Sequence, residues 1–228
     1  MESKRAVITG SSSGIGKEVA LQLLEKGHVV FGLSRRDGGI NHPNFHFIKT
    51  NVREVKEVDK AFDQIGHCDF LINNAGLGKF SLIEKTSLDD WHEMFDTNVN
   101  GIFYCTRRVI ESMKKKGSGH IINIASTAGL EGYATATAYC GTKHAVKGIS
   151  QALYKEVRDY GVKVTCVYPG SVKTDFFQHH PNIEPHDKML NPEEVANMIV
   201  MALESSSSFH QVNLEVRPLQ PQGAKVWK

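Results

Sequence analysis

Two kinds of segment recur along the chain, distinguished by where their hydrophobic residues fall. Short apolar runs rich in β-branched and aromatic residues lack apolar–polar alternation, which is typical of parallel strands buried on both faces. The predicted strands are 5–9, 28–33, 45–50, 69–72, 120–125, 163–168 and 211–216. Longer segments with helical spacing lie between them, and the predicted helices are 14–26, 53–65, 88–116, 139–160 and 192–204.

Strands that alternate with helices predict a parallel sheet with helices on both faces. We therefore expect an α/β protein with a three-layer, doubly wound Rossmann fold and a mostly parallel seven-stranded sheet. No linker rich in proline, glycine or serine and no repeat of fixed period divides the 228 residues. Residues 1–228 are predicted to form a single domain, a size that one core can serve.

Composition and charge argue against several classes of partner. The 27 basic and 25 acidic residues leave a net charge of +2, which gives no general argument for nucleic acid or an anionic membrane surface. No apolar run approaches the ~18 residues of a membrane helix, and residues 1–5 lead into a strand without a signal-peptide apolar region. The four cysteines have no CxxC spacing. We expect a cytoplasmic protein with reduced thiols and neither a nucleic-acid nor a membrane partner.

The first predicted strand runs into the glycine-rich segment TGSSSGIG at residues 9–16. Its glycines, Gly10, Gly14 and Gly16, permit a tight turn and close approach of a ligand to the backbone, and the following helix N-terminus favours a diphosphate. The spacing G-x-x-x-G-x-G differs from the G-x-G-x-x-G fingerprint, and alone it also suits a plain strand-to-helix turn. Its position in the first strand–helix unit favours nucleotide binding.

The second predicted strand is followed by Ser34, Arg35, Arg36 and Asp37. An acid at the end of this strand would bind the 2′-hydroxyl of NAD(H), whereas an arginine accommodates the 2′-phosphate of NADP(H). Ser34 stands where the acid is expected and two arginines follow, so the sequence favours NADP(H) over NAD(H). The alternative is a solvated basic loop whose charge Asp37 partly cancels.

Four polar residues are candidates for chemistry. Tyr139 and Lys143 are one helical turn apart on one helix face, which on most helices is only a surface contact. Ser126 follows strand 120–125, and Asn98 lies in the long predicted helix. The carboxyl ends of the strands of an open α/β sheet form its ligand crevice, so these residues are expected to meet there.

These residue types suit reduction of a carbonyl, which needs a hydride at carbon and a proton at oxygen. A free phenol has a pKa of ~10, and we expect the ammonium of Lys143 to lower the pKa of Tyr139 toward neutrality. The Ser126 hydroxyl would donate a hydrogen bond to the carbonyl oxygen as negative charge develops there.

With these motifs together, the chain resembles the short-chain dehydrogenase/reductase family, in its compact single-domain branch, from about residue 4 to beyond residue 170. The resemblance implies that Tyr139 is the general acid/base, Lys143 its helper, Ser126 the carbonyl-orienting hydroxyl and Asn98 a proton-relay and structural residue. It also implies an NAD(P)-binding site. The expected cofactor-binding residues are Gly10, Ser12, Ser13, Gly14, Ile15, Gly16, Ser34, Arg35, Asn51, Val52, Asn74, Ala75, Gly76, Tyr139, Lys143, Pro169, Gly170, Val172 and Thr174.

Two segments depart from the family pattern. Members often have Asp-Val after the third strand, where this chain has Asn51 and Val52. Many end in an Asp-Gly-Gly segment, where this chain has LEVRPL at 214–219. That tail resembles the branch with small hydroxy-acid and serine dehydrogenases and some carbonyl reductases.

A substrate lid is expected at about 174–190, a segment rich in phenylalanine, histidine and proline. Lys173, His179 and Lys188 are candidates for binding a substrate carboxylate. Glu131 and Tyr133 either contact substrate or are ordinary loop residues. Clustered lid histidines, His179, His180 and His186, raise the alternative of a metal site, but no companion ligands support it, and we expect no metal.

The sequence therefore predicts an NADP(H)-dependent oxidoreductase that interconverts a carbonyl and a secondary alcohol on a small or medium substrate. A hydroxy-acid or serine-type dehydrogenase and a general carbonyl reductase both stay open. Two other classes are a catalytically silent NADP-sensing regulator and a sugar-nucleotide epimerase, for which the chain after residue 169 is short. The resemblance implies a homodimer or homotetramer paired through the long helices, with a monomer as the alternative.

Overall fold

The computed structural model describes residues 2–177 and 186–220, and seven strands in these ranges form one sheet. Their order is β3-β2-β1-β4-β5-β6-β7, and every neighbouring pair is parallel. The strands are β1 (Arg5–Thr9), β2 (Val29–Ser34), β3 (Phe45–Lys49), β4 (Phe70–Asn73), β5 (Gly119–Ile124), β6 (Val162–Pro169) and β7 (Asn213–Val216). The order reverses direction between β1 and β4, as in the predicted Rossmann fold, and ligands bind at such a reversal.

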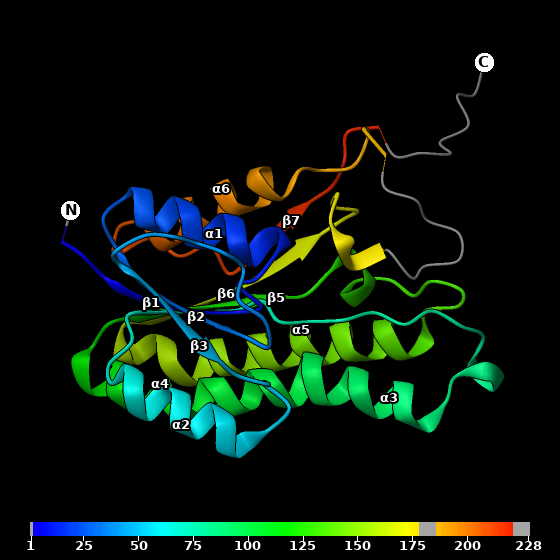
Figure 1. Cartoon of the computed structure of the whole chain (residues 1–228), viewed down its shortest axis with the longest axis horizontal. Coiled ribbons are helices and arrows are strands. Elements are labelled where there is room, and N and C mark those ends of the chain that lie inside the picture. The colour runs from blue at the N-terminus through cyan, green and yellow to red at the C-terminus, as the bar shows by residue number, and fades with distance from the viewer. Residues whose placement is uncertain (1, 178–185, 221–228) are drawn as a thin grey trace.

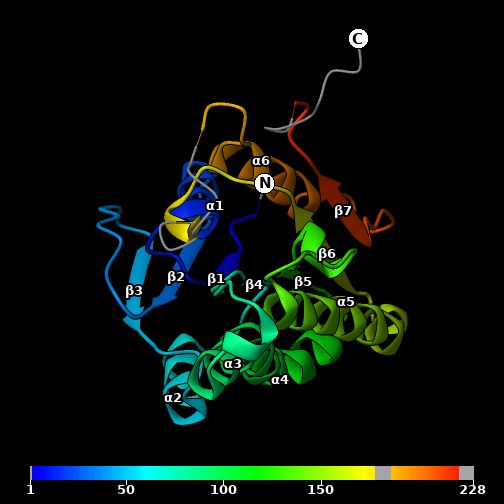
Figure 2. The same cartoon turned by 90° about the vertical axis from the view of Figure 1, so that its right-hand side faces the viewer.

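Helices cover both faces of the sheet and make three layers (Figures 1 and 2). One face carries α1 (Gly14–Glu25) and α6 (Pro192–Leu203); the other carries α2 (Val55–Ile65), α3 (Leu88–Phe95), α4 (Gly101–Lys116) and α5 (Thr137–Val157). Short 3-10 turns are η1 (Ile83–Lys85), η3 (Thr127–Gly129), η4 (Arg158–Tyr160) and η5 (Asp175–Phe177). None of the helices in the described ranges is long and apolar enough to cross a membrane.

Strand β1 contributes side chains to two separate cores. Ile8 of β1 packs in a buried cluster with Leu23 of α1 and Ile199 of α6. Its neighbour Val7 packs in a second cluster with Val58 of α2. Because successive strand residues point to opposite faces, a strand buried on both sides is apolar throughout, as the sequence predicted.

The segment predicted as one helix, 88–116, is helical throughout but is not a single regular α-helix. A π-helical turn, η2 (Asp96–Asn100), separates α3 from α4. The turn itself contains no glycine or proline that would have predicted it. The neighbouring Gly101 is already the first residue of α4. The turn carries Asn98, which is buried and hydrogen-bonded to the backbone of the segment after β4. Such turns are frequent at functional sites, and here tertiary hydrogen bonds overrule local helical periodicity.

Candidate active site

A cleft of about 1700 Å³ runs along the carboxyl edge of the sheet, and its lining residues follow the ends of all seven strands. The predicted catalytic and cofactor-binding residues all line this cleft except Gly16 and Asn98. Thus segments between residues 10 and 174 that are far apart in sequence meet in one space.

The glycine turn after β1 is held by a residue from the far side of the sheet reversal. The Asn74 side chain donates from Nδ2 to the carbonyl oxygens of Thr9, 3.0 Å away, and Gly10, 3.1 Å away. Gly10 and Gly14 have φ angles of 68° and 55°, which favour glycine. Gly16 lies behind the turn, where its missing side chain leaves room for Asn74. Gly16 is therefore a packing residue.

Thr9 was missed by the sequence analysis. Its buried hydroxyl accepts hydrogen bonds from the backbone amides of Asn74 and Ala75, each 3.0 Å away. The signal that was available is a polar residue at the end of an otherwise apolar strand.

The N-terminus of α1 faces this cleft with its charge uncompensated. Ser13, at the N-cap, makes no side-chain hydrogen bond to the first helical turn, and that turn contains no acidic residue. The glycine cradle and the positive end of the helix dipole are suited to an anion such as a diphosphate. The residues present therefore fit a dinucleotide cofactor.

Arginines line the end of the cleft beyond β2. Arg35 and Arg36 are exposed there, next to Asn51 and Val52 after β3. Asp37 does not line the cleft, and its carboxylate accepts a hydrogen bond from the Gly39 amide. The acid that might have cancelled the basic charge is thus not part of the cleft lining.

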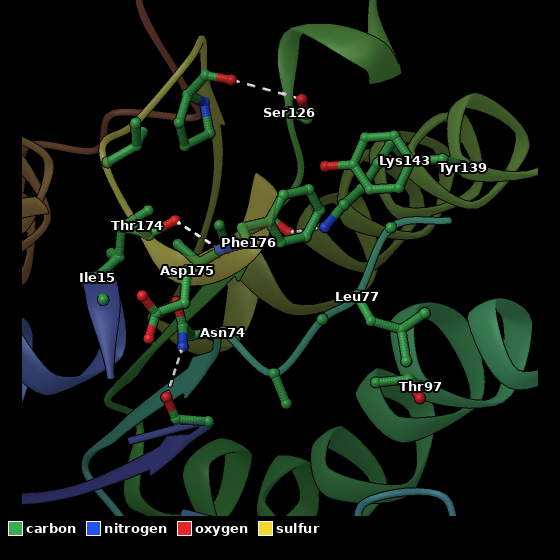
Figure 3. Close-up of a pocket in the computed structure, with 18 of the residues that line it drawn as sticks. Ile15, Asn74, Leu77, Thr97, Ser126, Tyr139, Lys143, Thr174, Asp175 and Phe176 are labelled. Atoms are coloured by element: carbon green, nitrogen blue, oxygen red, sulfur yellow. Dashed lines mark hydrogen bonds between the residues drawn. The ribbon is translucent and has the colours of Figure 1, made fainter. Parts of the chain in front are cut away.

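The opposite half of the cleft carries the candidate catalytic side chains (Figure 3). Tyr139 and Lys143 project from α5 and are both buried, while Ser126 lies just after β5. The Lys143 Nζ lies 5.7 Å from the centroid of the Tyr139 ring. Ser126 accepts a hydrogen bond from the Ala128 amide at 3.1 Å and donates one to the Pro169 carbonyl oxygen at 3.5 Å. The geometry brings a phenol, an ammonium and a hydroxyl to one wall.

The pKa of the Tyr139 phenol differs from the value expected from the sequence. Burial raises the pKa of Tyr139 above its ordinary value, and a hydrogen bond with Ser126 acts in the opposite direction. Burial also lowers the pKa of Lys143 to about 8. Lys143 donates its hydrogen bond to the Ile124 carbonyl oxygen, 2.9 Å away. The expectation that Lys143 lowers the pKa of Tyr139 is therefore wrong for this structure. Desolvation is the largest cause of the pKa shift of both groups.

Asn98 is anchored by the protein itself. Its Oδ1 accepts from the Leu77 amide at 2.9 Å, and its Nδ2 donates to the Leu77 carbonyl oxygen at 2.8 Å and to the Thr142 hydroxyl at 3.0 Å. These bonds tie the segment after β4 to the helix that carries Tyr139 and Lys143. They give Asn98 a structural role; its part in a proton relay stays a prediction.

Aromatic rings border the candidate catalytic residues. Phe80 and Phe176 lie with ring centroids 5.5 and 5.6 Å from that of Tyr139. Phe176 belongs to the expected lid, whereas Phe80 was missed, although an aromatic residue soon after a strand end is a usable signal. The predicted lid is described at 174–177 and 186–190, so His179 and His180 lie outside the described residues.

The charged residues that line the substrate end of the cleft are not the lysines expected from the sequence. Lys173 and Lys188 do not line the cleft, and Lys173 pairs with Asp187 at 2.9 Å. Arg217, directly after β7, does line it. Within residues 2–177 and 186–220, no group of three or more His, Cys, Asp or Glu side chains is arranged to hold a metal ion.

Comparisons with known proteins agree with this architecture. The family model for short chain dehydrogenases matches residues 4–184. An uncharacterized oxidoreductase of Staphylococcus saprophyticus is 34% identical over 238 residues, covering 96% of this chain and 97% of the relative. The chain belongs to the short-chain dehydrogenase/reductase family and is an oxidoreductase.

Solved structures share the fold over nearly the whole chain. The closed form of serine dehydrogenase complexed with NADP⁺ aligns with a TM-score of 0.84 and 28% identity, covering 93% of this chain and 94% of that one. ElxO with bound NADP aligns with a TM-score of 0.85 and 28% identity, covering 95% and 98%.

Proposed function

We propose that this protein is an NADP(H)-dependent oxidoreductase that interconverts a carbonyl and a secondary alcohol on a small or medium-sized substrate. One observation carries the proposal: Ser126, Tyr139 and Lys143 share a cleft with a glycine turn and an uncapped helix N-terminus. A site for an anionic cofactor thus adjoins groups that can move a proton.

The cofactor would lie across the sheet reversal. The first turn of α1 would hold the diphosphate, and Arg35 would pair with the 2′-phosphate of NADP(H). Support for this cofactor comes from Asp37, which does not line the cleft, and from the NADP-bound serine dehydrogenase and ElxO. When bound, the nicotinamide would supply or accept the hydride.

Side chains of the protein would protonate and hydrogen-bond the carbonyl oxygen of the substrate. In reduction, Tyr139 gives its phenolic proton to the carbonyl oxygen, and the Ser126 hydroxyl donates a hydrogen bond to the same oxygen as charge develops. Lys143, whose pKa is lowered to about 8, exchanges protons near neutral pH and restores the phenol. One hydride and one proton thus convert the carbonyl to the alcohol, and oxidation runs the same steps in reverse.

The alternative of a catalytically silent NADP sensor has no support in the site, because the phenol, ammonium and hydroxyl are all present on one wall. These residues favour an enzyme of alcohol–carbonyl interconversion.

Location and assembly form part of the same proposal. All four cysteines are free and buried, as is usual in a reducing compartment, and we propose a cytoplasmic protein. Phe103 on α4 is 58% exposed, which supports pairing of this helix with a second copy in a homodimer or homotetramer.

A substrate panel tests the proposal. Purified protein is mixed with NADPH and an oxo acid, a neutral ketone or an aldehyde to test reduction. It is mixed with NADP⁺ and a hydroxy acid or a secondary alcohol to test oxidation. NADPH absorbance is followed for each pair of cofactor and substrate. Turnover of at least one pair is expected. Tight NADPH binding without turnover of any pair would contradict the enzyme and favour the sensor.

A further inference from the structure

We propose that Arg217 selects substrates that carry a carboxylate near the reacting carbon, so that the site acts on small oxo acids and their hydroxy acids. The inference rests on the proposed oxidoreductase function of the same cleft and specifies its substrate class.

The backbone of Arg217 is held at the substrate end of the cleft by the sheet. Val216 pairs with Pro169 in the β6–β7 register, and its carbonyl oxygen accepts from the Gly170 amide at 2.7 Å. A Cβ on Gly170 would lie 3.4 Å from the Cα of Arg217. Ser126 donates to the Pro169 carbonyl oxygen at 3.5 Å, so the backbone of Arg217 and the candidate oxyanion donor both adjoin the Pro169–Gly170 segment.

Arg217 differs from the other cations that line the described part of the cleft. Three arginines, Arg35, Arg36 and Arg53, follow β2 and β3 at the far end. Lys79 follows β4, where it pairs with Asp90 and Glu93, and Lys143 lies buried beside Tyr139. Among the lysines and arginines that line the described part of the cleft, Arg217 is therefore the one that lies beside β6 and β7.

The guanidinium is oriented by one carboxylate and held loosely by another. Glu215 accepts from Nε at 2.6 Å, and Glu131 accepts from Nη1 at 3.0 Å. The side chain of Arg217 is 49% exposed, as is that of Glu131. Ion pairs between exposed side chains are weak, so exchanging Glu131 for a substrate carboxylate costs little. With Nε fixed by Glu215, the two terminal nitrogens can bind that carboxylate end-on.

Glu131 keeps a partner when Arg217 turns to the substrate. Its Oε1 also accepts from the Tyr133 hydroxyl at 2.6 Å, and the same hydroxyl lies 3.5 Å from the Thr127 Oγ1, next to Ser126. Glu131 is thus a built-in competitor that occupies Arg217 in this structure and can release it without being left unpaired.

The test compares an oxo acid with its neutral ester. Acetoacetate and methyl acetoacetate are reduced with NADPH by the wild type and by Arg217→Gln, and kcat/KM is measured for each. We expect the variant to lose about 10- to 100-fold on the acid, the effect of one charged hydrogen-bonded contact, and less than about threefold on the ester. Glu131→Gln is expected to lower KM for the acid alone, because it removes the competitor.

Controls separate a specific effect from loss of charge or fold. Arg158→Gln removes an arginine of similar exposure, 54%, that is ion-paired away from the cleft, and both substrates should react as in the wild type. Lys173→Gln tests one of the three residues that the sequence suggested for binding a substrate carboxylate. Thermal melting and NADPH titration verify that each variant is folded.

Equal losses on acid and ester in Arg217→Gln, or an acid-specific loss in Lys173→Gln instead, would overturn the assignment of Arg217. A wild type that reduces the ester better than the acid would overturn the anion preference while leaving the oxidoreductase function intact. If the wild type binds NADPH but turns over no compound of the wider panel, the proposed function itself fails.

Discussion

The side-chain nitrogen of Asn74 occupies the space that a methyl group on Gly16 would need. A Cβ on Gly16 would lie 2.3 Å from the Asn74 Nδ2 and 2.5 Å from the carbonyl oxygen of Gly10. Asn74 uses that nitrogen to hold the turn after β1. The last glycine of the motif therefore shapes the cofactor site through a residue of another strand end.

Gly16→Ala is accordingly expected to damage the turn. Alanine normally stabilises a helical position by about 0.5–1 kcal/mol relative to glycine, but here its methyl group displaces Asn74. We expect the Kd for NADPH to rise at least about tenfold and the melting temperature to fall, measured by fluorescence titration and thermal unfolding. The matched control is Gly148→Ala in α5, where the added Cβ meets nothing within 4 Å. An equal Kd for NADPH and an equal melting temperature in the two variants would show that the position of Asn74 does not depend on the absence of a side chain at Gly16.

Tyr139→Phe is expected to bind NADPH as the wild type does and to lose between about 100- and 10,000-fold in kcat, because the proton donor is gone. Steady-state kinetics and NADPH titration measure the two effects. Tyr160→Phe removes a hydroxyl from an exposed tyrosine and serves as the control. Turnover retained by Tyr139→Phe would remove this phenol from the mechanism.

Arg35→Ala is expected to raise the KM for NADPH about 10- to 100-fold and to change the KM for NADH less than about twofold. The reason is that only NADP(H) carries the 2′-phosphate that an arginine can pair with. Each variant is assayed with both cofactors, so the NADH value is the internal control. An equal change for the two cofactors would mean that Arg35 does not contact the phosphate.

Stability is expected to fall on acidification through His120. Burial lowers the pKa of this ring to about 3, with Lys163 and His210 adding repulsion, and its Nε2 bonds the Thr165 hydroxyl at 2.8 Å. The unfolded chain gains this proton below pH ~6.5 while the folded chain does not. The free energy of unfolding therefore decreases as the pH drops from about 6.5 toward 3, by at most ~1.4 kcal/mol per pH unit from this group.

Urea unfolding at several pH values measures this dependence, and His120→Gln is expected to flatten it. His92→Gln, which changes an exposed histidine on α3, should keep the wild-type slope. If the slopes of the two variants were the same, His120 would not be a source of the acid sensitivity.

Much of the architecture followed from the amino-acid pattern. Apolar runs predicted all seven strands to within about two residues. Because parallel strands end at one edge of a sheet, the motifs after them were also expected to share a site. These inferences succeeded since side-chain periodicity and strand direction are local properties.

Long-range packing decided the rest. The π-helical turn at Asn98 and the position of Gly16 behind Asn74 depend on contacts between residues more than 20 positions apart. The pKa direction of Tyr139 depends on burial by several elements, which spacing along α5 does not reveal. Arg217 likewise reaches the cleft only because β7 pairs with β6. The sequence alone determined the elements, the family and the chemical groups, while the tertiary structure determined which of those groups are desolvated, paired or open to a substrate.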